Sequence, residues 1–208
     1  MRIGIIGSGN MGSTLGTLWA KAGHDVLFSS RHPEELADLV KKTPRSKAGT
    51  AEEAARFGDA VFIGVPYVAM PELTKTLAPL LSGKLVLDAG NISPNRDGAL
   101  AVTIKQTGKG SGSWTQSLLT GSRVVKAFNT VHYRNLLSEA HRASPRIGVP
   151  LAGDDPKAVE EAAQLVRDAG SDPLLLAGGM AASAKIDLGS PVWNTNKTAD
   201  EVRAALGL

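Results

Sequence analysis

The chain contains no cysteine, and aromatic residues make up only 4% of its 208 residues. It therefore has no disulfide, no thiol nucleophile and no cysteine-bound metal or iron–sulfur cluster. This absence is compatible with the cytoplasm, where we expect the protein to act. The 23 basic and 20 acidic residues are intermixed and leave a net charge of only +3. Nucleic-acid binding favours a concentrated basic stripe with aromatic stacking platforms, so we expect no nucleic-acid partner.

Long hydrophobic runs are also missing. No apolar stretch approaches the roughly 20 residues that a membrane-spanning helix needs, and the apolar patch in MRIGIIGSGNMG is too short and too interrupted by glycine for a signal peptide. No cluster of histidine and acidic residues with metal-ligand spacing stands out. We therefore expect neither a membrane segment nor a bound metal.

The chain does have a regular alternation of two kinds of segment. Short β-branched runs predict strands at residues 2–6, 25–29, 60–65, 85–88, 124–128, 147–152 and 174–177. Longer segments rich in alanine, leucine and charged residues predict helices at 10–22, 33–41, 50–57, 71–81 and 155–169. Such alternation favours βαβ units, and hence an α/β fold with a doubly wound, mostly parallel sheet of the Rossmann type. We expect residues 1–140 to form a nucleotide-binding domain and 141–208 a small α/β extension packed on the same sheet.

The alternation loosens between residues 91 and 113, where prolines, glycines and lysines accumulate. The run GKGSGS at 108–113 predicts a flexible segment. Two interpretations remain open for it: a loop that closes over a second substrate or binds its phosphate, and a mobile surface loop.

The first predicted strand runs into Gly7-Ser8-Gly9-Asn10-Met11-Gly12, a G-x-G-x-x-G pattern followed by a predicted helix. In this context the pattern indicates a dinucleotide site. Gly7 permits the tight turn, Gly9 lets the backbone approach a pyrophosphate, and Gly12 lets the helix pack closely. Free N–H groups at the start of the helix would receive the anion.

The second predicted strand ends in Ser30-Arg31-His32 rather than in an acidic residue. A carboxylate here would hydrogen-bond the ribose hydroxyls of NAD and repel a 2′-phosphate. A serine hydroxyl donates to phosphate, and a guanidinium forms charge-assisted contacts with it. The pair Ser30 and Arg31 therefore predicts NADP(H), with His32 as a weaker additional contact.

Four segments, GSGNMG, SSRHPEE, VPY at 65–67 and VVKAFNT at 124–130, together resemble the coenzyme F420-dependent NADP oxidoreductases, small reductases that pass hydride between NADP(H) and a deazaflavin. The KAFNT segment is also similar to the cytoplasmic reductase domain of a membrane ferric-reductase family that uses flavin. The resemblance implies a homodimer and an NADP site lined by the following residues of this chain: Ser8, Gly9, Asn10, Met11, Ser30, Arg31, Val65, Pro66 and Ala127. Two features depart from the family: Glu35 stands where members often carry lysine, and DAGNISPNRDG at 88–98 does not match the deazaflavin enzymes well.

Further candidates follow the ends of the predicted strands. We expect Tyr67, Ala89 and Asn91 beside the cofactor, and His132 as a possible proton donor to the reduced acceptor. For His132 we favour the alternative of a surface or helix-packing histidine, and Tyr67 could equally belong to the core. No Ser-His-Asp set stands out, which fits a reaction that needs little acid–base help.

Three functions are compatible with these features. The first is NADP(H)-dependent hydride transfer to a small-molecule acceptor of the deazaflavin or flavin type. The second is an NADPH-dependent reductase of another small substrate such as a 3-hydroxy acid or an imine, although such enzymes need a further helical domain. The third is a non-catalytic NADP(H)-binding sensor.

Overall fold

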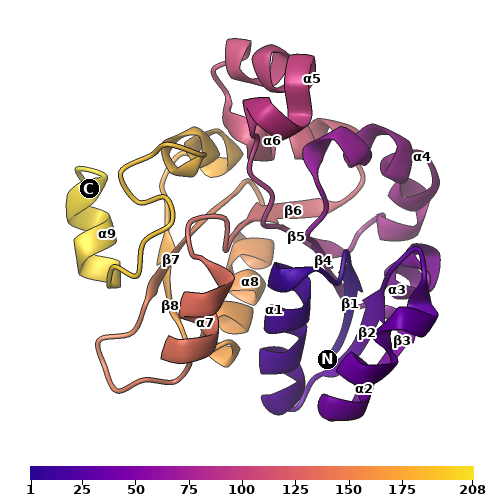
Figure 1. Ribbon diagram of the computed structural model, residues 1–208. Helices are drawn as coiled ribbons and strands as arrows, with labels where there is room; N and C mark the ends of the chain where they lie inside the picture. The colour runs from indigo at the N-terminus through magenta and orange to yellow at the C-terminus, as the bar shows by residue number, and fades with distance from the viewer.

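Eight strands form one sheet, in the order β3-β2-β1-β4-β5-β6-β7-β8, in a computed structural model that describes residues 1–208 (Figure 1). The strands are β1 (Arg2–Ile6), β2 (Asp25–Ser29), β3 (Ser46–Gly49), β4 (Ala60–Ile63), β5 (Leu85–Asp88), β6 (Arg123–Lys126), β7 (Gly148–Gly153) and β8 (Asp172–Leu175). Strands β1 to β6 are parallel, β7 is antiparallel to β6, and β8 is parallel to β7. The order 3-2-1-4-5-6 is that of a Rossmann sheet, so the predicted fold class is confirmed.

The helices cover both faces of this sheet. The α-helices are α1 (Asn10–Lys21), α2 (Ala37–Lys42), α3 (Ala51–Phe57), α4 (Met70–Leu81), α5 (Pro94–Gln106), α6 (Gly110–Leu118), α7 (Tyr133–Glu139), α8 (Pro156–Asp168) and α9 (Ala199–Ala205). Three 3₁₀ segments complete the set: η1 (Pro33–Leu36), η2 (Tyr67–Ala69) and η3 (Gly179–Ile186). No helix combines the length and the apolar content of a bilayer-crossing segment.

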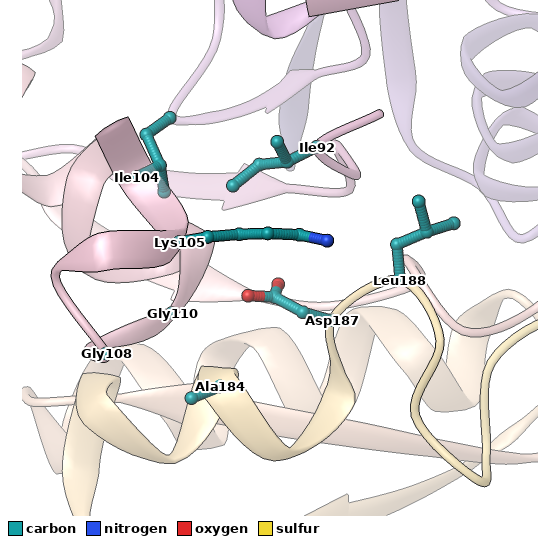
Figure 2. A pocket seen from close by; sticks show the side chains of 8 residues that line it. All are labelled: Ile92, Ile104, Lys105, Gly108, Gly110, Ala184, Asp187 and Leu188. Carbon is teal, nitrogen blue, oxygen red and sulfur yellow. The ribbon is translucent and has the colours of Figure 1, made fainter. Parts of the chain in front are cut away.

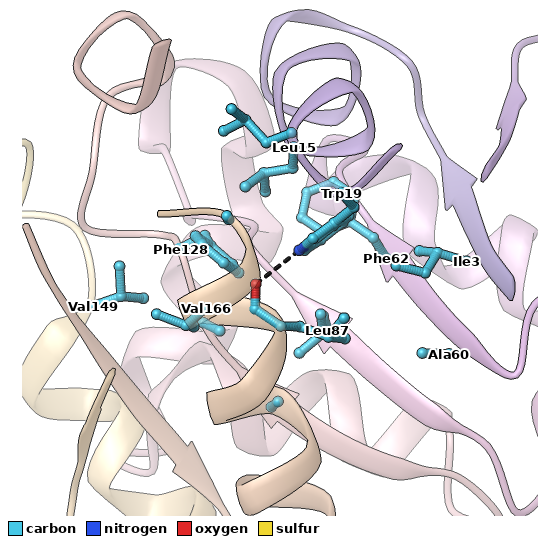
Figure 3. Close-up of a cluster of buried hydrophobic side chains, with 14 of the residues drawn as sticks. Ile3, Leu15, Trp19, Ala60, Phe62, Leu87, Phe128, Val149 and Val166 are labelled. Carbon is cyan, nitrogen blue, oxygen red and sulfur yellow. Dashed lines mark hydrogen bonds between the residues drawn. The ribbon is translucent and has the colours of Figure 1, made fainter. Parts of the chain in front are cut away.

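Alternate side chains of the strands point to opposite faces of the sheet and belong to two hydrophobic cores. Ile5 and Phe62 point into the larger core, which lies under α1 and α8, whereas Ile6 and Val61 point into the second, under α3 and α4. Trp19 of α1 is fully buried in the larger core, and its ring meets Phe62 and Phe128 edge-on at centroid distances of 5.9 Å (Figure 3). Strands buried on both faces explain why the predicted strands are continuous apolar runs rather than alternating ones.

The C-terminal part of the chain shares the larger core. Residues of β7 and α8, including Val149 and Val166, belong to the same cluster as Ile3 of β1. The Trp19 indole N–H donates to the Leu165 carbonyl oxygen at 2.8 Å, which joins α1 to α8 (Figure 3).

The segment 91–118 differs most from its prediction. It forms α5 and α6, which stand together above β5 and β6 in Figure 1. The expectation of a flexible run at 108–113 is wrong, because residues 110–112 are buried at the start of α6 against η3. A Cβ at Gly110 would lie 2.4 Å from the Ala184 nitrogen, and one at Gly112 would lie 2.6 Å from the Met180 sulfur. These glycines therefore permit close packing rather than mobility.

Candidate functional site

The ends of five neighbouring strands are tied into one edge by backbone hydrogen bonds. The Ser8 N–H donates to the Ser29 oxygen at 3.2 Å, and the Gly64 N–H donates to Ile6 at 2.9 Å. Further along, the Ala89 N–H donates to Ile63 at 3.3 Å, and the Ala127 N–H donates to Asp88 at 3.1 Å. Segments that follow β1, β2, β4, β5 and β6 thus converge at the carboxyl edge, where open α/β sheets bind ligands.

The loop after β1 has the geometry that its glycines predict. Gly7 has φ +94°, a conformation that side chains rarely adopt. A Cβ at Gly12 would lie 2.2 Å from the Gly7 oxygen, so this position must be glycine for α1 to start where it does. A Cβ at Gly9 would meet no atom within 4 Å, so the backbone there faces open space. Gly9 is therefore the point at which a ligand can approach the main chain.

This loop can hold an anion. The Ser8 hydroxyl is buried and has no hydrogen-bond partner in the protein, and an unsatisfied buried polar group is costly unless a ligand completes it. The first turn of α1, which contains Asn10 and Met11, carries no acidic residue, and its N-cap Gly9 supplies no side-chain cap. Free N–H groups at a helix N-terminus bind phosphate well, so these residues fit a pyrophosphate.

The end of β2 fits an additional phosphate. Arg31 is exposed and takes part in no ion pair. The Ser30 hydroxyl oxygen accepts the His32 N–H at 3.1 Å, which leaves its proton free to donate. The His32 Nδ1 lies 3.4 Å from the Glu34 carboxylate, so an acidic side chain already contacts the His32 ring. Glu35 is exposed on the short helix η1, where it does not oppose Arg31 through any ion pair.

The remaining predicted cofactor residues differ in accessibility. Pro66 is exposed, and Val65 and Ala89 are half-buried at the same edge. A Cβ on Gly7 would lie 2.8 Å from a Val65 methyl group, which places Val65 directly beside the loop of residues 7–12, the proposed phosphate loop. Tyr67 and Ala127, in contrast, are buried at 1% and 0% exposure. These two residues belong to the buried layer directly beneath the strand-end edge, called the floor below.

A buried polar network makes up this floor. Lys126 and Asp88, at the ends of β6 and β5, lie opposite each other in register and form a 3.1 Å ion pair. The Lys126 ammonium also donates to the Tyr67 hydroxyl oxygen at 2.8 Å and to the Gly90 carbonyl oxygen. The Tyr67 and Thr115 hydroxyls each donate to the same Asp88 oxygen at 2.7 Å.

The network fixes the segment that follows β5. Asp88 accepts the Gly90 N–H at 2.8 Å with its other oxygen, while Lys126 binds the carbonyl of the same residue. Burial, followed by the nearby Asp88 carboxylate, raises the pKa of Tyr67 well above its ordinary value. Tyr67 therefore stays a neutral hydrogen-bonding group, and it does not serve as an acid or base near neutral pH.

Two asparagines link the ends of β5 and β6. The Asn91 amide donates to the Asn129 carbonyl oxygen at 2.6 Å, and the Asn129 amide donates to the Ile186 carbonyl oxygen at 2.7 Å. The Asn129 side-chain oxygen is buried and has no partner. Asn129 thus joins the strand-end edge to η3, and its own side-chain oxygen makes no hydrogen bond.

His132, the predicted proton donor, caps a helix. Its Nδ1 accepts the Arg134 N–H at 3.3 Å at the start of α7, and its ring lies against Tyr133 with centroids 4.6 Å apart. This cap requires an unprotonated Nδ1, so Nε2 is the ring nitrogen left to carry a proton. A role for His132 in proton transfer stays a prediction.

Sequence reasoning missed Lys126, Asp88 and Thr115. A signal existed for the first two, since each is a charged residue that ends an apolar strand. Charged residues are almost never fully buried unless paired, and two such residues on neighbouring strands predict a pair. Nothing in the sequence indicated Thr115, because α6 itself was not predicted.

Comparisons with known proteins agree with this geometry. Residues 2–92 match the family model described as "NADP oxidoreductase coenzyme F420-dependent". The F420-dependent NADP reductase of Methanothermobacter thermautotrophicus is 24% identical over 217 residues, covering 99% of this chain and 93% of the relative. The rat metalloreductase STEAP3 is 28% identical over 189 residues, which span 89% of this chain but only 36% of that protein.

A solved structure of a hypothetical protein from Sinorhizobium meliloti is similar over most of the chain. It has a TM-score of 0.78 and 25% sequence identity, and the match covers 95% of each chain. The resemblance to the F420-dependent NADP oxidoreductases is confirmed by the family model and by the relative from Methanothermobacter. The family model and the relative from Methanothermobacter both indicate an NADP-dependent oxidoreductase.

Proposed function

We propose that this protein, a relative of the F420-dependent NADP oxidoreductases, transfers hydride between NADP(H) and a small ring acceptor of the deazaflavin or flavin type. The cofactor supplies the hydride chemistry, and the protein binds, orients and shields it. The proposal rests on two groups at neighbouring strand ends. The Ser8 hydroxyl is buried without a hydrogen-bond partner, and Arg31 is exposed and makes no ion pair. These two groups suit the pyrophosphate and the 2′-phosphate of one dinucleotide.

The edge beyond the phosphate loop suits the nicotinamide half. Val65 and Ala89 offer small apolar surface there, and Gly90 is held from both sides by the buried network. A rigid wall on one side of the ring would fix which face it presents to an acceptor. Hydride transfer between two conjugated rings needs such positioning more than it needs a strong acid or base, and the edge has no reactive acid–base pair.

The test is a panel of acceptors. NADPH or NADH is mixed with the protein and with coenzyme F420, FMN, FAD or riboflavin, and oxidation of the nicotinamide is followed by absorbance. We expect NADPH-dependent reduction of at least one ring and a clear preference for NADPH over NADH. Tight NADPH binding without turnover on any ring would instead support the sensor function. Turnover only with imines or 3-oxo acids would support the other reductases.

A further inference from the structure

A cavity of about 200 Å³ lies beside the strand-end edge, between α5, the start of α6 and the end of η3 (Figure 2). Its apolar lining includes Ile92, Ile104 and Leu188, and its charged lining consists of Lys105 and Asp187. The volume is below the roughly 300–1,000 Å³ of pockets that enclose a whole drug-sized ligand. The cavity can therefore hold part of a ligand whose remainder lies elsewhere.

Two residues that line the cavity are sequence neighbours of residues at the strand-end edge. Ile92 directly follows Asn91, and Asp187 directly follows Ile186, whose carbonyl oxygen binds the Asn129 amide. The unpartnered Asn129 oxygen lies at this junction. A ring placed against the nicotinamide could extend its side chain past this buried junction into the cavity.

The two charged groups of the cavity are not equivalent. Asp187 accepts the Ser111 N–H at 2.9 Å and the Ser111 hydroxyl, so both of its oxygens are engaged at the start of α6. Lys105 makes no ion pair. Figure 2 shows the Lys105 side chain crossing between Ile92 and Asp187, with its ammonium directed toward Leu188, whereas the Asp187 carboxylate turns toward Gly110. The cavity is thus lined by one exposed lysine that makes no ion pair and by one carboxylate whose two oxygens are already hydrogen-bonded.

From this arrangement we propose that the cavity binds the phosphate-bearing side chain of the acceptor and that the Lys105 ammonium contacts its phosphate. The proposal rests on the ring-acceptor function proposed above. Ile92 and Leu188 pack against the aliphatic part of the side chain, and the cation selects acceptors that carry an anionic end. The protein should therefore discriminate between two acceptors that share a ring and differ only in phosphate.

FMN and riboflavin are such a pair. In steady-state oxidation of NADPH, we expect the KM for FMN to be lower than that for riboflavin by roughly tenfold or more, the effect of one charge-assisted contact. Lys105→Met should bring the ratio of the two KM values close to one. The matched control is Lys109→Met, because Lys109 is an exposed lysine four residues away that does not line the cavity. This variant should keep the wild-type ratio.

The outcomes separate the two proposals. Equal KM values for FMN and riboflavin in the wild-type protein, or equal effects of the two lysine variants, would overturn the role of Lys105 and leave hydride transfer to a ring intact. Absence of NADPH oxidation with every ring, coenzyme F420 included, would overturn both proposals. NADPH titration of the Lys105→Met variant checks that it is folded, since the phosphate loop lies on other elements.

Discussion

Lys126 and Asp88 form a 3.1 Å ion pair inside the protein, with side-chain exposures of 0% and 3%. Removing one partner leaves the other charged and buried without compensation. We therefore expect Lys126→Met to lower the free energy of unfolding by roughly 3–5 kcal/mol, as measured by urea denaturation. The control is Lys75→Met, which removes a lysine from an exposed pair with Glu72 and should change stability by less than about 1 kcal/mol. Similar losses in the two variants would contradict the importance of burial.

The phosphate loop predicts different outcomes for two glycine-to-alanine changes. Gly9 has φ −69° and ψ −165°, which alanine adopts readily, and a Cβ there meets nothing in the protein. Gly9→Ala should leave the thermal midpoint of the free protein unchanged, yet weaken NADPH binding by about tenfold or more, because the methyl group occupies the path of the pyrophosphate.

Gly12→Ala should instead affect both quantities. Its Cβ would lie 2.2 Å from the Gly7 oxygen, so the loop backbone has to move. A stability loss of roughly 1–3 kcal/mol is expected from such overpacking, together with loss of NADPH binding. Thermal unfolding without ligand and calorimetric titration with NADPH test both variants. Intact binding by Gly9→Ala would exclude close approach of the ligand at this residue.

Arg31 should decide which dinucleotide is preferred. Arg31→Asp replaces a cation with an anion beside Ser30, and the cost for NADPH should be a few kcal/mol, from a lost charge-assisted contact plus repulsion. NADH, which lacks the 2′-phosphate, should lose much less. Arg203→Asp, an exposed arginine on α9, serves as the control. Equal losses for NADPH and NADH in the Arg31 variant would refute its contact with the 2′-phosphate.

Asp97 should make stability depend on pH. Burial acts to raise the pKa of Asp97, but hydrogen bonds from Arg96 and from the Ser93 and Val68 N–H groups outweigh it, so the pKa lies below its ordinary value. A carboxyl group of this kind stabilises the fold above its unfolded pKa of about 3.9, and the contribution is lost as pH falls through the lower folded value. The stability difference between wild type and Asp97→Asn should therefore shrink below about pH 4. A difference that stays constant between neutral and acidic pH would contradict this.

Local sequence rules predicted much of the sheet and the phosphate loop. Gly7 turns the chain with φ +94°, and Gly12 packs against the oxygen of Gly7, five residues earlier, so a short pattern is enough to indicate both glycines. The strands β1, β4 and β5 are continuous apolar runs whose buried position follows from composition. The strand β3 was missed, because it is a short segment of small and polar residues at the edge of the sheet.

Features that depend on distant partners were not predictable in this way. Gly110 and Gly112 have the composition of a mobile loop, and only the contact with η3 shows that they are needed for close packing. Lys126 is buried because Asp88 and Tyr67, far away in sequence, satisfy its ammonium. The division into residues 1–140 and 141–208 stays a prediction.

The bond between Trp19 and Leu165 bears on that division. It spans the suggested boundary, and the apolar cluster around it takes in residues from β1 to the end of α8. A fragment ending near residue 140 would leave one side of α1 exposed to solvent and the Trp19 indole N–H without its acceptor. The proposed dinucleotide-binding loop, which leads into α1, therefore depends on a helix much later in the chain, and the two halves should unfold in a single cooperative transition.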